Sequence, residues 1–220
     1  MVKGISKLVS LVFHPLFIIT YVTLFLLFAD PYSFGVHSIE SQVPFVLMIF
    51  FTTAVIPIIA VLLMKFLGLV QTFELKDAKE RIGPYIITGI FYIWLTVNLV
   101  NDTEVPAIYT IFVLGSAIGL FLSFFVNNFV KISAHAVGMG GLMGFFLLMM
   151  QQSSDAFWVS LGPSQAIGIP FVYLFVLSVV LTGLVCNSRL VLKAHQTKEV
   201  LQGVLVGLSS IFFAMAFIQM

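Results

Sequence analysis

Long apolar runs separated by short polar clusters make up most of the chain. A transmembrane helix needs about 17 to 25 mainly apolar residues. Runs that reach or approach this length are Ser6 to Ala29, Val43 to Met64, Tyr85 to Val100, Ala107 to Val130, His135 to Met150, Ala166 to Asn187 and Val200 to Gln219. The pattern predicts an all-α polytopic transmembrane helix bundle of about seven spans. Because no long polar insertion interrupts it, we expect residues 1–220 to form one integral-membrane domain.

The composition agrees with a chain whose solvent is lipid. Hydrophobic residues make up 60% of the 220 residues and charged residues 9%, whereas soluble domains carry about 25% charged residues. We therefore expect a lipid bilayer as the environment and no nucleic-acid partner, and the sequence does not indicate an oligomeric state. The single cysteine, Cys186, cannot form a disulfide within the chain, so no redox role is expected.

Charged residues are distributed unequally between the two ends of the predicted spans. With seven spans, all ten Lys and Arg fall on one face, and the opposite face carries only acids. The positive-inside rule predicts that the basic face is cytoplasmic. We expect the membrane to be a bacterial cytoplasmic membrane. A phosphate-binding site would also gather cations, but Lys3, Lys7 and Lys65, which lie outside the polar clusters, share the same face.

Three polar clusters interrupt the apolar sequence on the basic face. They are Glu74 to Pro84, Lys131 to His135 and Asn187 to Glu199. Because an even number of predicted helices separates each cluster from the next, all three can converge at one membrane edge. Together they offer Arg side chains, which bind phosphate oxygens bidentately, and Lys side chains, which add point charge. Two histidines there could act as nucleophile and general acid.

The third cluster carries the most specific spacing. His195 and Glu199 are four residues apart, so on a helix the carboxylate can accept from one ring nitrogen and leave the other free to attack an electrophile or to accept a proton. Arg189 precedes His195 by six residues and points elsewhere on a continuous helix. A bend between the two would let both face one pocket. By itself this segment is equally compatible with a loop that contacts lipid headgroups.

Small residues follow the second and third clusters at intervals of four. Ala136, Gly140 and Gly144 form one series, and Gly203 and Gly207 form the other. Small residues at this spacing let helix backbones approach closely. We therefore expect the helices that begin near His135 and Val200 to pack together and to hold the two clusters side by side.

His14 lies before Pro15 within the first predicted span, near its basic end. A histidine in such a position favours a structural or interfacial role over a place in the site.

The three clusters resemble the signatures of the type 2 phosphatidic acid phosphatase family, whose active-site plan is shared with vanadium haloperoxidases. Ser188-Arg189, His195 and Glu199 match Ser-Arg-x5-His-x3-Asp at every spacing, with Glu in place of Asp. Ile132-Ser133-Ala134-His135 matches Pro-Ser-Gly-His at Ser and His. The Lys-x6-Arg-Pro signature is degenerate, because Arg81 is followed by Ile82-Gly83-Pro84 and Glu74 stands where Lys is expected. The resemblance covers residues 74–203.

The resemblance implies a role for each matched residue. His195 would be the nucleophile that forms a phosphohistidine, Glu199 would orient it, and His135 would be the general acid. Arg189, Arg81 and Ser133 would bind phosphate oxygens. The missing Lys could be replaced by Lys76, Lys79 or Lys131, and the sequence does not choose among them. The family requires no metal or cofactor.

The predicted function is a metal-independent phosphatase that hydrolyses a lipid phosphate monoester or diphosphate. Phosphatidic acid, phosphatidylglycerol phosphate and polyprenyl phosphates are all compatible with the apolar walls. The alternative is a catalytically inactive relative that binds or moves an anionic lipid, as the degenerate signature would allow. A small transporter is less favoured, because the polar groups cluster at one membrane edge and transporter sites lie near the midplane.

Overall fold

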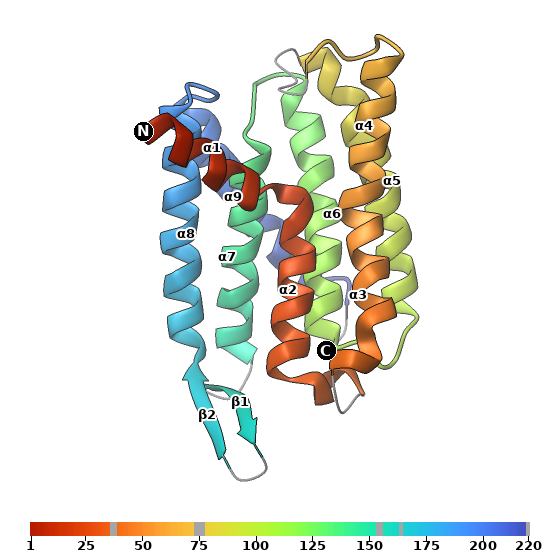
Figure 1. Cartoon of the computed structure of the whole chain (residues 1–220), viewed down its shortest axis with the longest axis vertical. Helices are drawn as coiled ribbons and strands as arrows, with labels where there is room; N and C mark the ends of the chain where they lie inside the picture. The colour runs from red at the N-terminus through yellow and green to blue at the C-terminus, as the bar shows by residue number, and fades with distance from the viewer. Residues whose placement is uncertain (36–38, 73–77, 153–155, 163–164, 219–220) are drawn as a thin grey trace.

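The computed structural model describes all residues except 36–38, 73–77, 153–155, 163–164 and 219–220 (Figure 1). In the described part, six helices are long and apolar enough to cross a membrane, and a bent pair, α1 with α2, could form a seventh span. These findings confirm the prediction of an all-α polytopic bundle. The helices are α1 (Val2–Val12), α2 (Pro15–Ala29), α3 (Val43–Phe50), α4 (Ile56–Phe66), α5 (Ala78–Val100), α6 (Ala107–Asn127), α7 (Ala134–Gln152), α8 (Phe171–Val191) and α9 (Thr197–Met215).

The first predicted span is not one straight helix. The chain bends by 62° between α1 and α2. Pro15 occupies the first turn of α2, where its missing N–H costs nothing, and it holds His14 in an extended conformation that ends the preceding helix. The His14 Nδ1 accepts from the Leu16 N–H at 3.4 Å and so caps the new helix. The apolar run was predicted correctly, but its break at the His-Pro pair was not.

Proline also shapes the helices that follow. The second predicted span forms α3, a π-helical segment at Phe51–Val55, and α4. Pro57 has no N–H to offer the carbonyl of Thr53, and a wider turn accommodates the missing bond. The third predicted span begins at Ala78 instead of Tyr85, with Pro84 inside α5.

The sixth predicted span begins later than expected, because a β-hairpin precedes it. Strand β1 (Ala156–Gly162) pairs antiparallel with β2 (Gln165–Pro170), and α8 starts at Phe171. Pro170 stands at the N-cap of α8. A run of apolar residues does not distinguish a short strand from the first turn of a helix, so the hydropathy pattern placed Ala166 in the helix.

Helices α7 and α9 pack closely, as the small residues predicted. A Cβ on Gly203 would lie 2.7 Å from the Cβ of Ala136 and 2.9 Å from the carbonyl oxygen of Ser133, and a Cβ on Gly207 would overlap the carbonyl of Val137. Such separations are possible only where one residue has no side chain. The prediction that small residues join these two helices is confirmed.

Buried aromatic residues join α2, α6 and α7. The rings of Phe112 on α6 and Phe145 on α7 have centroids 4.8 Å apart. The Tyr109 hydroxyl lies 2.6 Å from the Thr23 hydroxyl, so the polar tip of this buried ring has a partner on α2. These contacts hold α2, α6 and α7 together beneath the polar end.

The described Lys and Arg side chains come from elements at one end of the bundle. In Figure 1 this end is at the top, where α1 lies and where α4, α6 and α8 end. The loops that carry Asp30 and Asp102 lie at the opposite end. The predicted separation of basic and acidic ends therefore appears in the fold. Lys76 lies outside the described residues.

Candidate functional site

A tight loop reverses the chain between α8 and α9. The Lys193 N–H donates to the Leu190 carbonyl at 2.9 Å, and the Ala194 N–H donates to the Arg189 carbonyl at 3.1 Å. This pair of bonds ends α8 in a Schellman motif, with Lys193 in the left-handed conformation at φ 53°. The reversal brings Arg189, at the end of α8, to the same cavity as His195. This reversal is the bend that Arg189 and His195, six residues apart, need if both are to face one pocket.

His195 and Glu199 form the predicted pair. His195 Nδ1 lies 2.7 Å from Glu199 Oε2, and the two side chains are 8% and 14% exposed. The same carboxylate oxygen accepts from the Gln196 N–H at 3.2 Å, in a capping box that begins α9. Because an ionised carboxylate only accepts, the ring proton lies on Nδ1, and Nε2 keeps its lone pair.

The surroundings of His195 favour the neutral ring. Burial lowers the pKa of His195 from 6.5 to about 4, and the positive charges of Arg189 and Lys131 lower it as well, while the interaction with Glu199 opposes them. The ring is therefore uncharged near pH 7, which is the state in which Nε2 can act as a nucleophile.

Hydrogen bonds join the second polar cluster, Lys131 to His135, directly to the third, Asn187 to Glu199. Lys131 Nζ donates to the Ala194 carbonyl at 2.7 Å, and the Ser133 N–H donates to the Glu199 carbonyl at 3.3 Å. Ser133 is fully buried, and its Oγ accepts from the Ala136 N–H at 3.4 Å in the first turn of α7. Its hydroxyl supports the helix start and is not part of the described cavity lining.

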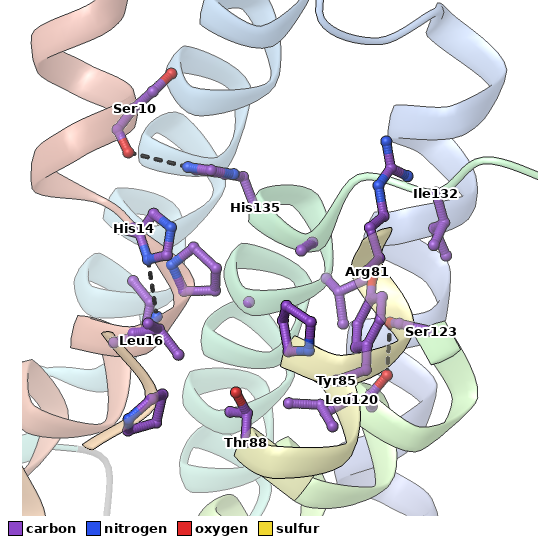
Figure 2. A pocket seen from close by; sticks show the side chains of 18 of the residues that line it. Ser10, His14, Leu16, Arg81, Tyr85, Thr88, Leu120, Ser123, Ile132 and His135 are labelled. Carbon is purple, nitrogen blue, oxygen red and sulfur yellow. Dashed lines mark hydrogen bonds between the residues drawn. The ribbon is translucent and has the colours of Figure 1, made fainter. Parts of the chain in front are cut away.

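His135 contacts the N-terminal helix. Its Nε2 donates to the Ser10 carbonyl at 3.0 Å, and its ring lies edge-on to that of His14 with centroids 5.1 Å apart. Figure 2 shows Ser10, His14 and His135 together on one side of the cavity. The Arg189 charge acts on the rings of His14, His135 and His195. All three imidazoles line the same cavity as Arg189.

Arg81 reaches the cavity from α5. The side chain is 9% exposed, and its Nη1 donates to Asn127 Oδ1 at 2.9 Å at the end of α6. Figure 2 shows it opposite His135, with Tyr85 one turn further along α5. Lys79, in contrast, is exposed, and Lys131 lines the cavity. Of the two alternative lysines in the described part of the chain, Lys131 is the one at the site.

One cavity of about 1030 Å³ joins these residues. Its polar end is lined by Lys7, Arg81, Lys131, Arg189, Lys193, His14, His135 and His195. No Asp or Glu is found among the described lining residues. An excess of cations with no lining carboxylate gives this end a positive potential, which favours an anion over a cation as ligand. Within the described ranges, no group of three His, Cys, Asp or Glu is arranged to hold a metal ion.

Sequence reasoning placed His14 among structural residues and did not assign Ser10 or Asn127 a role. His14 does cap α2, but it also lines the cavity, because the 62° bend turns α1 back over the polar end. The His-Pro pair was the signal that could have indicated the bend. Asn127 had no such signal, since its contact with Arg81 joins two different helices.

Comparison of the chain with protein-family models, with curated proteins and with solved structures gives no match.

Proposed function

We propose that this protein is a metal-independent phosphatase that hydrolyses a lipid phosphate monoester or diphosphate through a phosphohistidine. The observation that carries the proposal is a neutral, carboxylate-bound His195 that lines a cavity rich in cations. The resemblance of residues 74–203 to the type 2 phosphatidic acid phosphatase signatures supports the same reaction. Phosphatidic acid, phosphatidylglycerol phosphate and polyprenyl phosphates are the candidate substrates.

The proposed reaction has two steps. His195 Nε2 attacks phosphorus and the P–O bond to the leaving group breaks. A doubly protonated His135 gives one proton to the departing lipid alkoxide, or to the departing lipid phosphate of a diphosphate, and becomes neutral. Water then attacks the phosphohistidine, a proton returns to His135, and inorganic phosphate leaves. Arg189, Arg81 and Lys131 would neutralise the phosphoryl oxygens as charge redistributes. Glu199 would stabilise the positive charge that develops on His195.

A second function, the binding of an anionic lipid without hydrolysis, is favoured by one contact. The Nε2 proton of His135 is held by the Ser10 carbonyl, so His135 can protonate a leaving group only if α1 moves away or if the ring carries a second proton on Nδ1. A protein that held this contact permanently would retain the lipid phosphate and release nothing.

Phosphate release by the purified protein distinguishes the two functions. In detergent, with a chelator and no added metal, we expect hydrolysis of at least one lipid phosphate from the candidate classes. Vanadate should inhibit it, because this oxyanion adopts the trigonal-bipyramidal geometry of phosphoryl transfer. If no lipid yields phosphate while one binds saturably, the phosphatase proposal is wrong and the binding function is favoured.

Lys131 is proposed to complete the phosphate site. We expect Lys131→Met to lower kcat/KM by about tenfold to a hundredfold, since a hydrogen bond to a charged group contributes about 1.5–3 kcal/mol. Lys79→Met is the matched control and should stay within about twofold, because the side chain is exposed. Equal losses in the two variants would remove Lys131 from the proposed site.

We also propose that the basic end faces the cytoplasm of a bacterial cell, as the positive-inside rule favours. A Lys193→Cys variant in a Cys186→Ser background should resist a membrane-impermeant maleimide in intact cells and react after lysis. Labelling in intact cells would show that the basic end faces outward and that this proposal is wrong.

A further inference from the structure

The cavity continues from its polar end into an apolar limb between α2, α4, α5 and α6. The limb is lined by Leu16, Ile18, Ile19, Pro57, Ile58, Val61, Leu62, Tyr92 and Leu120. From Arg81 to Tyr92 on α5, the lining descends by roughly 16 Å at 1.5 Å per residue. One leaflet of a bilayer whose hydrocarbon core is about 30 Å thick has about this depth.

Two serine hydroxyls in the limb donate within their own helix, α6. Ser116 Oγ donates to the Phe112 carbonyl at 2.9 Å, and Ser123 Oγ donates to the Gly119 carbonyl at 2.6 Å. Figure 2 shows this last bond on the wall that carries Leu120. Because their protons are used within the helix, these two serines do not require a polar ligand, and the aliphatic side chains around them suit hydrocarbon.

The limb reaches the outer surface of the bundle on α1 and α4. Leu11, Ile58 and Leu62 line the cavity and are also 65%, 39% and 48% exposed. Figure 1 shows the corner between α1 and α2 and the helix α4 at the basic half of the molecule. In a membrane protein, large apolar side chains exposed at this depth face lipid tails.

Helix α1 lies between the polar end of the cavity and the surrounding lipid tails. Its buried residues are Ser6 and Ser10, whereas Ile5 and Leu8 are exposed. The polar face of this helix therefore turns toward the protein and the apolar face turns outward. An anionic headgroup under α1 and a hydrocarbon chain along α4 would each meet a surface of matching character.

We propose that the apolar limb binds one hydrocarbon chain of the anionic lipid, and that this chain enters from the bilayer through an opening bounded by Leu11, Ile58 and Leu62. The proposal rests on the lipid phosphate of the proposed function, whether or not it is hydrolysed. The cations at the polar end of the cavity hold the phosphate, and the apolar limb accepts a chain about as long as one leaflet is deep. Leu62 is then a residue that determines specificity for the chain.

Two tryptophan variants test the opening. Leu62 and Leu63 are adjacent on α4 and are 48% and 57% exposed, but only Leu62 is among the described lining residues. We expect Leu62→Trp to lower kcat/KM for dioleoyl phosphatidic acid by about tenfold, the scale of a steric change in an apolar pocket. Phenyl phosphate, which has no chain, should be unaffected. Leu63→Trp should resemble the unaltered protein with both compounds, and equal effects of the two variants would overturn the proposal.

Photolabelling gives a readout that needs no turnover. The probe is phosphatidic acid with a diazirine in the middle of one acyl chain, in phosphatidylcholine vesicles. We expect labelling of α4 at residues 58–62 that excess phosphatidic acid suppresses and that Leu62→Trp reduces. A diacylglycerol carrying the same diazirine should give no saturable labelling there. Saturable labelling elsewhere on the protein would overturn the inference.

The outcomes also separate this inference from the proposed function. Saturable labelling of residues 58–62 without phosphate release would leave the chain site intact and contradict hydrolysis. Phosphate release with equal kinetics in the Leu62→Trp and Leu63→Trp variants would support hydrolysis and contradict the chain site.

Discussion

Replacing His195 with asparagine is expected to lower kcat for lipid phosphate hydrolysis by about 10⁴-fold or more, the scale of losing a catalytic nucleophile. His195 is the histidine whose Nδ1 is held 2.7 Å from a carboxylate and whose Nε2 is left available. The measurement is steady-state phosphate release from the substrate that the unaltered protein hydrolyses best. Rapid quenching with radiolabelled lipid should trap an acid-labile, base-stable phosphoprotein in the unaltered chain and none in His195→Asn.

Two further variants show whether the loss of activity comes from the missing imidazole or from a disturbed structure. Lys198→Asn alters an exposed residue in the first turn of α9 and should retain activity. Glu199→Gln keeps the size of the side chain but removes its charge, so we expect kcat to fall by about 10⁴-fold, as when another carboxylate-oriented histidine loses its partner. If His195→Asn turns over at more than a tenth of the normal rate, the phosphohistidine mechanism is wrong. Thermal unfolding in detergent should show that all three variants remain folded.

A Gly207→Val variant is expected to destabilise the bundle by about 3 kcal/mol or more, at the upper end of overpacking effects. A Cβ at this position would overlap the carbonyl of Val137 and lie 2.7 Å from the Gly141 nitrogen. These are backbone atoms of α7, so they cannot rotate away as a side chain could. Relief requires α7 and α9 to separate, which would also move His135 away from His195.

The matched control is Gly183→Val on α8. A Cβ at Gly183 would meet no heavy atom within 4 Å, and valine is no worse a helix former than glycine. We expect this control to unfold at the normal temperature in detergent, while Gly207→Val shows a clear fall in both melting temperature and yield. If the two variants melt together, the close approach of α7 and α9 does not stabilise the protein.

Much of the fold follows from patterns that are local in the sequence. The apolar runs identified the helices, and the positions of Lys and Arg identified one basic end. Boundaries were less accurate where Pro or a short strand intervened, as at Pro15 and at Gln165–Pro170. In these places the local backbone chemistry decides between elements that share the same hydropathy.

The candidate site, like the fold, could be predicted only in part from the sequence. The pair formed by His195 and Glu199 could be predicted, because four residues on or beside a helix place two side chains together whatever surrounds them. The contact between Arg81 and Asn127 could not be predicted, because it joins two helices. Nor could the sequence choose Lys131, whose place depends on a bond to the Ala194 carbonyl across the site.

The sequence by itself therefore determined the membrane class, the basic end, the close packing of α7 on α9 and the orientation of His195 by Glu199. The tertiary structure alone decided that α1 folds back over the polar end, that Ser10 and His14 meet His135 there, and that an apolar limb opens beside Leu62. The first set depends on periodicities that the helix imposes on neighbours in the chain. The second depends on the direction of a bend and on contacts between distant helices, which no local spacing specifies.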